Sequence, residues 1–127
     1  MRLFLAVLLC GFATFAQAAE WALVSQISNN SREVDKNSIR GVKPLLSFTS
    51  RHAIDDASEF KVGHNAVKYL VMEQQVDCAK RSTVVLSNEA QRADGSKISK
   101  QRLLGQEPNA VLQGSVDEDV LKFVCTQ

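Results

Sequence analysis

The side chains with the clearest potential for acid-base or metal chemistry are His52 and two nearby carboxylates, Asp55 and Asp56. Imidazole and carboxylate groups are common metal ligands and proton-transfer groups. The spacing Arg-His-x-x-Asp-Asp matches no ligand pattern, however, and His64 lies across a predicted loop. We therefore interpret His52 as a strand residue beside a solvated acidic turn, and we predict neither a metal site nor a bound cofactor.

Motifs for other kinds of catalysis are missing from the sequence. It contains no Gly-x-Ser-x-Gly elbow, no phosphate-binding glycine loop and no His-Glu-x-x-His pair. A small hydrolase that depends on His52 would therefore need a catalytic set that the sequence does not display. We predict a protein that is not an enzyme.

The first eighteen residues have the three parts of a secretory signal peptide. Arg2 supplies the positive charge, residues 3–15 form an apolar run, and Ala16-Gln17-Ala18 places small side chains at a cleavage site. The apolar run is too short for a membrane span, which needs about 20 residues. We predict a signal peptide over 1–18, a single domain over 19–127, and export to the periplasm or the extracellular space, with no transmembrane segment.

Three cysteines occur in the chain, and the predicted cleavage removes Cys10. A lipid anchor on Cys10 is the alternative fate, but Leu9 stands where a lipoprotein signal has a small residue, so we do not expect lipidation. Two thiols then remain, and in an oxidising compartment Cys78 and Cys125 are expected to form a disulfide. The rival interpretations are a redox pair and a metal site, although neither cysteine belongs to a Cys-x-x-Cys or Cys/His cluster.

The charge of the predicted mature domain is balanced, with 14 acidic residues and 14 of the 15 basic ones. A neutral domain offers no electrostatic argument for a nucleic acid or an anionic membrane as partner. Within this neutral chain four basic residues gather around the Asp94-Gly95 turn: Arg92, Lys97, Lys100 and Arg102. They could contact acidic groups on a protein partner. Alternatively, they form a solvated hairpin whose lysines discourage pairing between sheet edges.

The elements that would carry these residues are mostly strands. Alternation of apolar and polar residues predicts strands at 21–27, 46–54 and 70–78, with shorter strands at 34–39 and 83–86. Residues 67–71 also fit a helical spacing, but the polar Gln74 favours a strand there. Asp94-Gly95 predicts a hairpin turn before a strand over 97–103, and residues 55–65 are predicted to form a loop.

One helix is predicted, at the C-terminus. Ser115-Val116-Asp117-Glu118 has the Ser-x-x-Glu form of a capping box. Val116, Val120 and Val124 recur at steps of four, and Cys125 adjoins this apolar stripe. We therefore predict an α+β fold, in which an antiparallel sheet of about five to six strands is packed by one C-terminal helix and tied to it by the Cys78–Cys125 disulfide.

The sequence also resembles a known family. The similarity is carried by Trp21, Val34-Asp35 followed by Ser38-Ile39, Asp77-Cys78 followed by Arg81, Gly95, Gly114-Ser115 and Val124-Cys125. In these features it is similar to the bacterial surface-adhesin protein E family. That resemblance implies a small exported domain with an antiparallel sheet and a disulfide-tied helix, and an adhesin-like role in binding host matrix or serum proteins.

Two function classes remain at the level of sequence. The first is an exported, non-enzymatic, adhesin-like protein that contacts a protein partner through the sheet edge or the basic hairpin. The second is a periplasmic protein inhibitor of a cell-wall hydrolase, of the lysozyme-inhibitor type, because small disulfide-bonded β domains can serve in that way. The sequence identifies neither the partner nor the oligomeric state.

Overall fold

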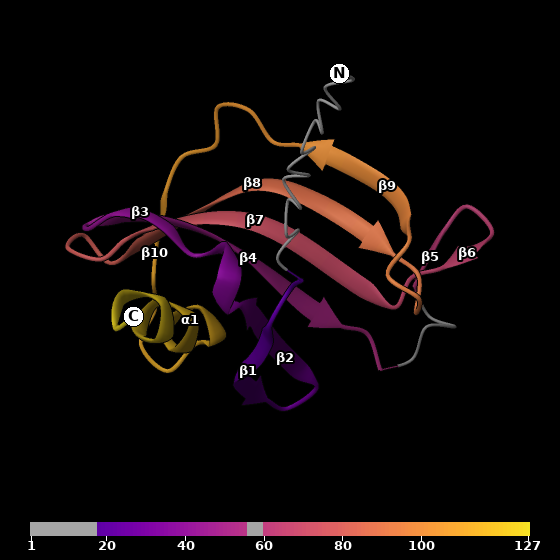
Figure 1. The fold of residues 1–127 in the computed structure, drawn as a ribbon, viewed down its shortest axis with the longest axis horizontal. Helices are drawn as coiled ribbons and strands as arrows, with labels where there is room; N and C mark the ends of the chain where they lie inside the picture. The colour runs from indigo at the N-terminus through magenta and orange to yellow at the C-terminus, as the bar shows by residue number, and fades with distance from the viewer. Residues whose placement is uncertain (1–17, 56–59) are drawn as a thin grey trace, which may run out of the picture.

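The computed structural model describes residues 18–55 and 60–127 of the chain. The predicted signal peptide, with Cys10, lies almost wholly outside the described residues, as does Asp56. Ten strands, one 3-10 helix and one α-helix are formed within those ranges (Figure 1): β1 (Trp21–Ile27), β2 (Asn30–Asp35), η1 (Lys36–Ser38), β3 (Arg40–Val42), β4 (Leu45–Ala53), β5 (Lys61–Val62), β6 (Asn65–Ala66), β7 (Tyr69–Asp77), β8 (Ser82–Gln91), β9 (Lys97–Arg102), β10 (Asn109–Ala110) and α1 (Val116–Cys125).

Eight of these strands form one antiparallel sheet, and six of them follow each other in the order β1-β2-β4-β7-β8-β10. Strand β3 pairs with the start of β4, while β9 pairs with the end of β8. The remaining strands, β5 and β6, form a separate small hairpin. The central strands are therefore β4, β7 and β8, and each is nine or ten residues long.

Strand β4 and the second half of β7 have the alternating burial that the sequence predicts. Leu46 pairs with Val76 and Phe48 pairs with Gln74, so these four side chains point to the same face. Gln74 is 2% exposed and is accommodated by a hydrogen bond, since its Oε1 accepts from Ser50 Oγ at 2.5 Å. The polar residue that favoured a strand over a helix therefore lies in the core-facing row, paired with a second buried polar side chain.

Helix α1 begins where the sequence predicts. Ser115 is the N-cap, and its Oγ accepts from the Glu118 N–H at 3.2 Å. The second half of the predicted capping box differs, because Glu118 Oε1 accepts from the Gly114 N–H at 3.3 Å rather than from the Ser115 N–H. The Glu118 side chain thus satisfies the N–H of the residue that precedes the N-cap.

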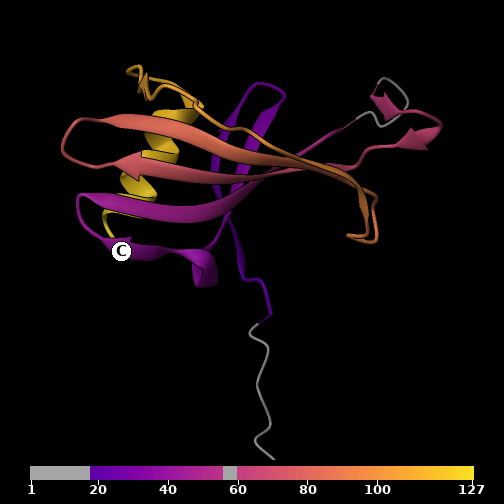
Figure 2. The same ribbon diagram turned by 90° about the horizontal axis from the view of Figure 1, so that it is seen from above.

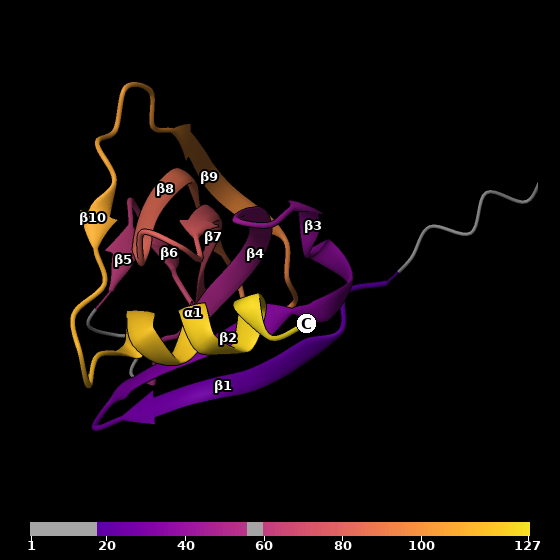
Figure 3. The same cartoon turned by 90° about the vertical axis from the view of Figure 1, so that its left-hand side faces the viewer.

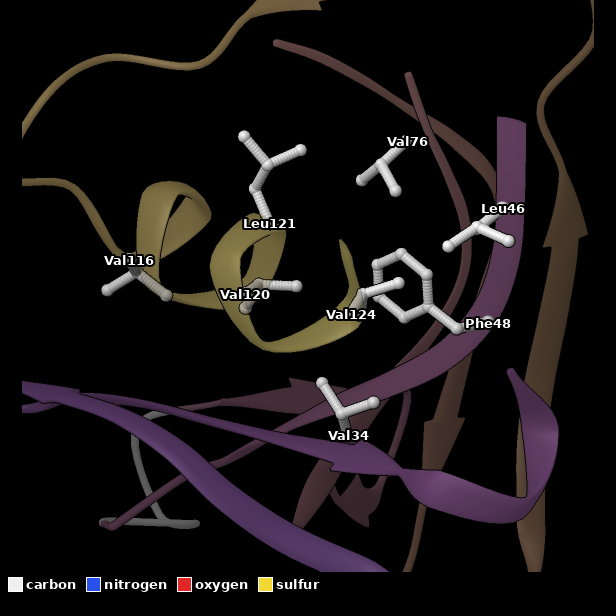
Figure 4. Packing of buried hydrophobic residues seen from close by; sticks show 8 residues of the cluster. All are labelled: Val34, Leu46, Phe48, Val76, Val116, Val120, Leu121 and Val124. Atoms are coloured by element: carbon white, nitrogen blue, oxygen red, sulfur yellow. The ribbon is translucent and has the colours of Figure 1, made fainter. Parts of the chain in front are cut away.

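The hydrophobic core lies between α1 and the sheet. Figure 4 shows four side chains of each converging there: Val34, Leu46, Phe48 and Val76 from the strands, and Val116, Val120, Leu121 and Val124 from the helix. Burial of each large aliphatic or aromatic side chain contributes about 1.5–3 kcal/mol before entropy is counted. The apolar stripe of α1 therefore fixes the helix on the sheet.

The predicted disulfide is confirmed. Cys78 follows β7 and Cys125 ends α1, and their Cα atoms are 5.9 Å apart across the S–S bond. Both cysteines pack against the core cluster. The helix is therefore held to the sheet covalently as well as by packing.

Helix α1 covers only one end of the sheet. In Figure 2 it lies behind one half, while the other half continues as a thin, twisted layer that ends near the β5–β6 hairpin. Figure 3 shows α1 lying between the β1–β2 hairpin and the rest of the sheet, which agrees with its contacts to β1, β2 and β4. The fold therefore has a two-layer end and a single-layer end.

The α+β prediction is confirmed, with more strands than the five to six expected. The strand predicted at 34–39 is instead the end of β2 followed by η1, because Asp35 Oδ1 accepts from the Asn37 N–H and caps a helical turn. Within the loop predicted at 55–65, the hairpin begins at Lys61. Strand β10 was not predicted, since a two-residue pairing leaves no alternation in the sequence.

Candidate functional site

The Asp94-Gly95 turn connects β8 to β9 as predicted. The Arg92 N–H donates to the Ser96 carbonyl at 2.9 Å, and Gly95 adopts a left-handed φ of 83°. Asp94 Oδ1 accepts from the Ser96 N–H at 2.9 Å. Hydrogen bonds from Ser96 lower the pKa of Asp94, which keeps its carboxylate charged and the turn closed.

Three of the four predicted basic residues share one face of β9. Lys97, Lys100 and Arg102 lie opposite Gln91, Glu89 and Ser87 of β8. Those partners are spaced by two along β8. A register irregularity between Ala90 and Gln91 adds one residue to β9, so Lys97 comes to the same side of the sheet as Lys100 and Arg102. All three are exposed, and together they form a basic strip along β9.

The fourth basic residue lies elsewhere and holds the turn. Arg92 donates through Nη1 to Ser96 Oγ at 3.3 Å and to the Lys97 carbonyl at 3.1 Å. Its Nη2 donates to Asn65 Oδ1 at 3.2 Å, which ties the turn to β6. Most of its donors are therefore engaged within the chain, unlike those of the basic strip.

The charges of the basic strip are only partly neutralised. Lys100 Nζ lies 3.6 Å from Glu73 Oε1 on β7, with both side chains more than a third exposed. Lys97 and Arg102 make no ion pair with any residue that the structure describes. An exposed pair of this kind is worth about 0–1 kcal/mol, so the strip can exchange it for contacts with a partner.

Strand β9 is also an edge of the sheet. It pairs with β8 on one side, and no other strand in the described ranges pairs with it. The unpaired N–H and C=O groups along such an edge can accept an additional strand. The candidate site is therefore this edge, defined by the basic strip Lys97, Lys100 and Arg102 and the outer backbone of β9.

A second cationic feature lies on the same face of the sheet as the basic strip, and the sequence analysis did not predict it. The Arg51 guanidinium lies over the rings of Trp21 and Tyr69, at 4.2 and 4.3 Å from their centroids. Arg51 Nε donates to Glu33 Oε2 at 2.5 Å, and both side chains are mostly buried. These four residues come from β1, β2, β4 and β7, so their approach follows from strand order rather than from any local sequence signal.

The interpretation of His52 as a strand residue agrees with the structure. Its Nδ1 lies 2.8 Å from the Ser31 carbonyl, a contact between β4 and β2. Among the described residues no group of three or more His, Cys, Asp and Glu side chains is placed to hold a metal ion.

The described residues also include no helix long and apolar enough to span a membrane.

Comparison with known proteins decides the family. The model of the family described as surface-adhesin protein E matches residues 21–126, which is nearly all of the described chain. This chain belongs to the surface-adhesin protein E family. The resemblance seen in the sequence is confirmed.

Solved structures agree on the fold. Protein E of Haemophilus influenzae superposes with a TM-score of 0.63 at 10% identity, over 84% of this chain and 83% of that one. Protein E from non-typeable Haemophilus influenzae gives a TM-score of 0.57 at 10% identity, over 82% and 75% of the two chains. At such low identity the likeness establishes the fold and leaves site residues unassigned.

No curated protein matches the sequence of this chain. The family is one of surface adhesins, so a binding role has support from its membership. The alternative role as an inhibitor of a cell-wall hydrolase draws no support from these comparisons.

Proposed function

We propose that this protein is an exported, non-enzymatic, adhesin-like protein that contacts a protein partner through the β9 edge. Membership of the surface-adhesin protein E family supports the adhesin-like role. One observation carries the choice of surface. In the described ranges β9 has an unpaired backbone edge, and it also carries three cationic side chains on one face.

The chemistry of this edge favours an acidic, extended segment of the partner. Such a segment could add to β9 by main-chain hydrogen bonds, and its carboxylates could meet Lys97 and Arg102. Lys100 would exchange Glu73 for a partner carboxylate. Cations on an edge strand discourage pairing with a second copy of the same edge, which favours a partner of opposite charge.

The binding test compares two matched double variants. Lys97→Glu with Arg102→Glu reverses two charges of the basic strip that make no ion pair in the described chain. Lys61→Glu with Lys80→Glu changes the net charge equally at exposed positions outside β9. The wild-type protein is first tested against an array of purified extracellular-matrix and serum proteins.

For a protein that the wild type binds, the β9 variant should lose affinity by about tenfold or more, mainly through slower association. The control variant should bind as the wild type does. Equal binding by both variants would remove β9 from the contact surface, and an array with no bound protein would contradict the adhesin-like role.

Export is proposed together with a domain boundary after Ala18. The signal-peptide pattern over 1–18 supports it. Cell fractionation followed by mass spectrometry of the N-terminus should find a chain that begins at Ala19, outside the cytoplasm. A chain that retains Met1, or one lipidated at Cys10, would contradict this processing.

A further inference from the structure

A cavity with a cationic rim lies away from β9, beside the C-terminal end of α1. Its volume is about 360 Å³. Lys36, Arg40 and Lys43 line it from η1, β3 and the turn before β4, while Ile39, Leu46 and Val124 supply apolar lining. Figure 1 places β3 and the end of α1 at one end of the sheet and the β8–β9 turn near the other.

Among the residues that the structure describes, no acidic side chain lines this cavity. Lys36 Nζ lies 3.7 Å from Glu20 Oε1, a pair whose side chains are 45% and 60% exposed. Arg40 and Lys43 form no ion pair within the described chain. Three exposed cations therefore line one concave site, and two of them have no acidic partner among the described residues.

The three cations are not needed to satisfy the carbonyl groups at the C-terminal end of α1. The Phe123 carbonyl accepts from Thr126 Oγ1 at 3.1 Å and from Gln127 Nε2 at 2.9 Å. The Val124 carbonyl accepts from the Gln127 N–H at 3.4 Å. The last turn of α1 therefore satisfies these carbonyls with its own following residues.

The backbone that carries the cations is held in place. Gly41 has a φ of 110°, and a Cβ added there would lie 2.7 Å from the Leu45 carbonyl oxygen, so only glycine permits this close pairing of β3 with β4. Ser38 Oγ donates to the Asp35 carbonyl and accepts from the Thr49 N–H, each at 2.7 Å. The cations thus project from a segment fixed to the sheet.

We propose that this cavity binds a sugar unit bearing sulfate or phosphate groups. The cations would bind the anionic groups by charge-assisted hydrogen bonds, for which the guanidinium of Arg40 is well suited. A cavity of this volume is much larger than a lone oxyanion and falls in the range of small-molecule sites. The ring that carries the charge would occupy the remaining space against Ile39 and Leu46.

The test is a titration of the full domain followed by NMR. The probes are a sulfated heparin disaccharide, the same disaccharide without sulfate, and inorganic sulfate. The sulfated disaccharide should shift the amide signals of Ile39, Gly41 and Gln127, and inorganic sulfate should shift the same signals at higher concentration. The neutral disaccharide should leave them unchanged. Shifts induced equally by the neutral sugar, or no shift with the sulfated one, would overturn the proposal.

Variants then assign the site. Arg40→Glu should weaken binding of the sulfated disaccharide by about tenfold or more, and Arg40→Lys should retain most of it. Lys61→Glu, the same change of charge on β5, should bind as the wild type does. Unchanged binding by Arg40→Glu, with folding checked by thermal melting, would overturn the assignment. None of these residues belongs to β9. A negative result for the cavity would therefore not contradict the proposed binding of a protein partner at β9, which the β9 variants test separately.

Discussion

Arg51 stabilises the fold, although it lies on the same face of the sheet as the basic strip of β9. Its guanidinium lies between Trp21 and Tyr69 and pairs with Glu33. A cation–π contact contributes about 0.5–2 kcal/mol, with the larger values for desolvated sites. The bidentate shape and flat faces of Arg make Lys a poor substitute in such a position.

We expect Arg51→Ala to lower the free energy of unfolding by about 2–4 kcal/mol, because two aromatic contacts and a largely buried ion pair disappear together. Arg51→Lys should lose roughly half as much, since it keeps the charge without the planar stacking. Urea unfolding followed by tryptophan fluorescence measures both changes, and Trp21 is itself the reporter.

Arg102→Ala is the matched control, because Arg102 is exposed and makes no ion pair within the described residues. It should change stability by less than about 0.5 kcal/mol. An Arg51 variant no less stable than this control would mean that the stacked arrangement contributes nothing to the fold.

At the residue scale the sequence predicted some partners and not others. Cys78 and Cys125 could be paired because they were the two cysteines left after the predicted cleavage. Arg51 appears in the sequence as one more charged residue on the polar side of an alternating strand. Its partners lie on three other strands, and only the strand order brings them together. The cationic cavity was missed for the same reason.

At the scale of the element, α1 depends on its first turn. Glu118 accepts from the Gly114 N–H and lies near Lys122 and Arg81, at 3.3 and 2.7 Å. The hydrogen bond from Gly114, followed by the two cations, lowers the pKa of Glu118 below its usual value of 4.5. The folded protein thus favours the charged form of this side chain.

This shift predicts an acid dependence of stability. A carboxyl group whose pKa is lowered by folding contributes stability above its unfolded pKa, and the contribution is lost as the pH falls through the folded pKa. We expect the melting temperature of the wild type to fall more steeply than that of Glu118→Gln between about pH 5 and pH 3. Glu107→Gln, a change at an exposed loop residue, should follow the wild-type curve. Parallel curves for all three proteins would contradict a role for Glu118.

Elements with a strong local signal were predicted well. The capping residues and the four-residue steps located α1, and alternation located β4 and β7. The strand predicted at 34–39 was wrong after Val34, because the Asp35 side chain caps a helical turn there. Alternation of apolar and polar residues does not reveal this local hydrogen bond. Strands β5, β6 and β10 have two residues each, and their pairing depends on the chain around them.

At the scale of the whole molecule, the sheet is unequally supported. At one end it packs against α1 through the core cluster and the disulfide. At the other end β7, β8 and β9 form a single layer beyond the helix (Figure 2). Binding surfaces are commonly drawn from the less stable parts of a fold, and β9 lies at this end.

Hydrogen exchange measured residue by residue tests this division. We expect amides paired between β8 and β9 to exchange first, because no strand in the described ranges pairs with the outer edge of β9 and Ile98 is the one apolar residue of that strand. Amides paired between β4 and β7 near Phe48 and Val76 should exchange last, with an opening free energy close to that of global unfolding. Val71 and Met72 on β7, which lie beyond the helix-covered end, should exchange at intermediate rates. Uniform protection across β7, β8 and β9 would show instead that the sheet opens as one cooperative unit. In that case a partner at β9 would meet a rigid strand, and its binding should require no ordering of the edge.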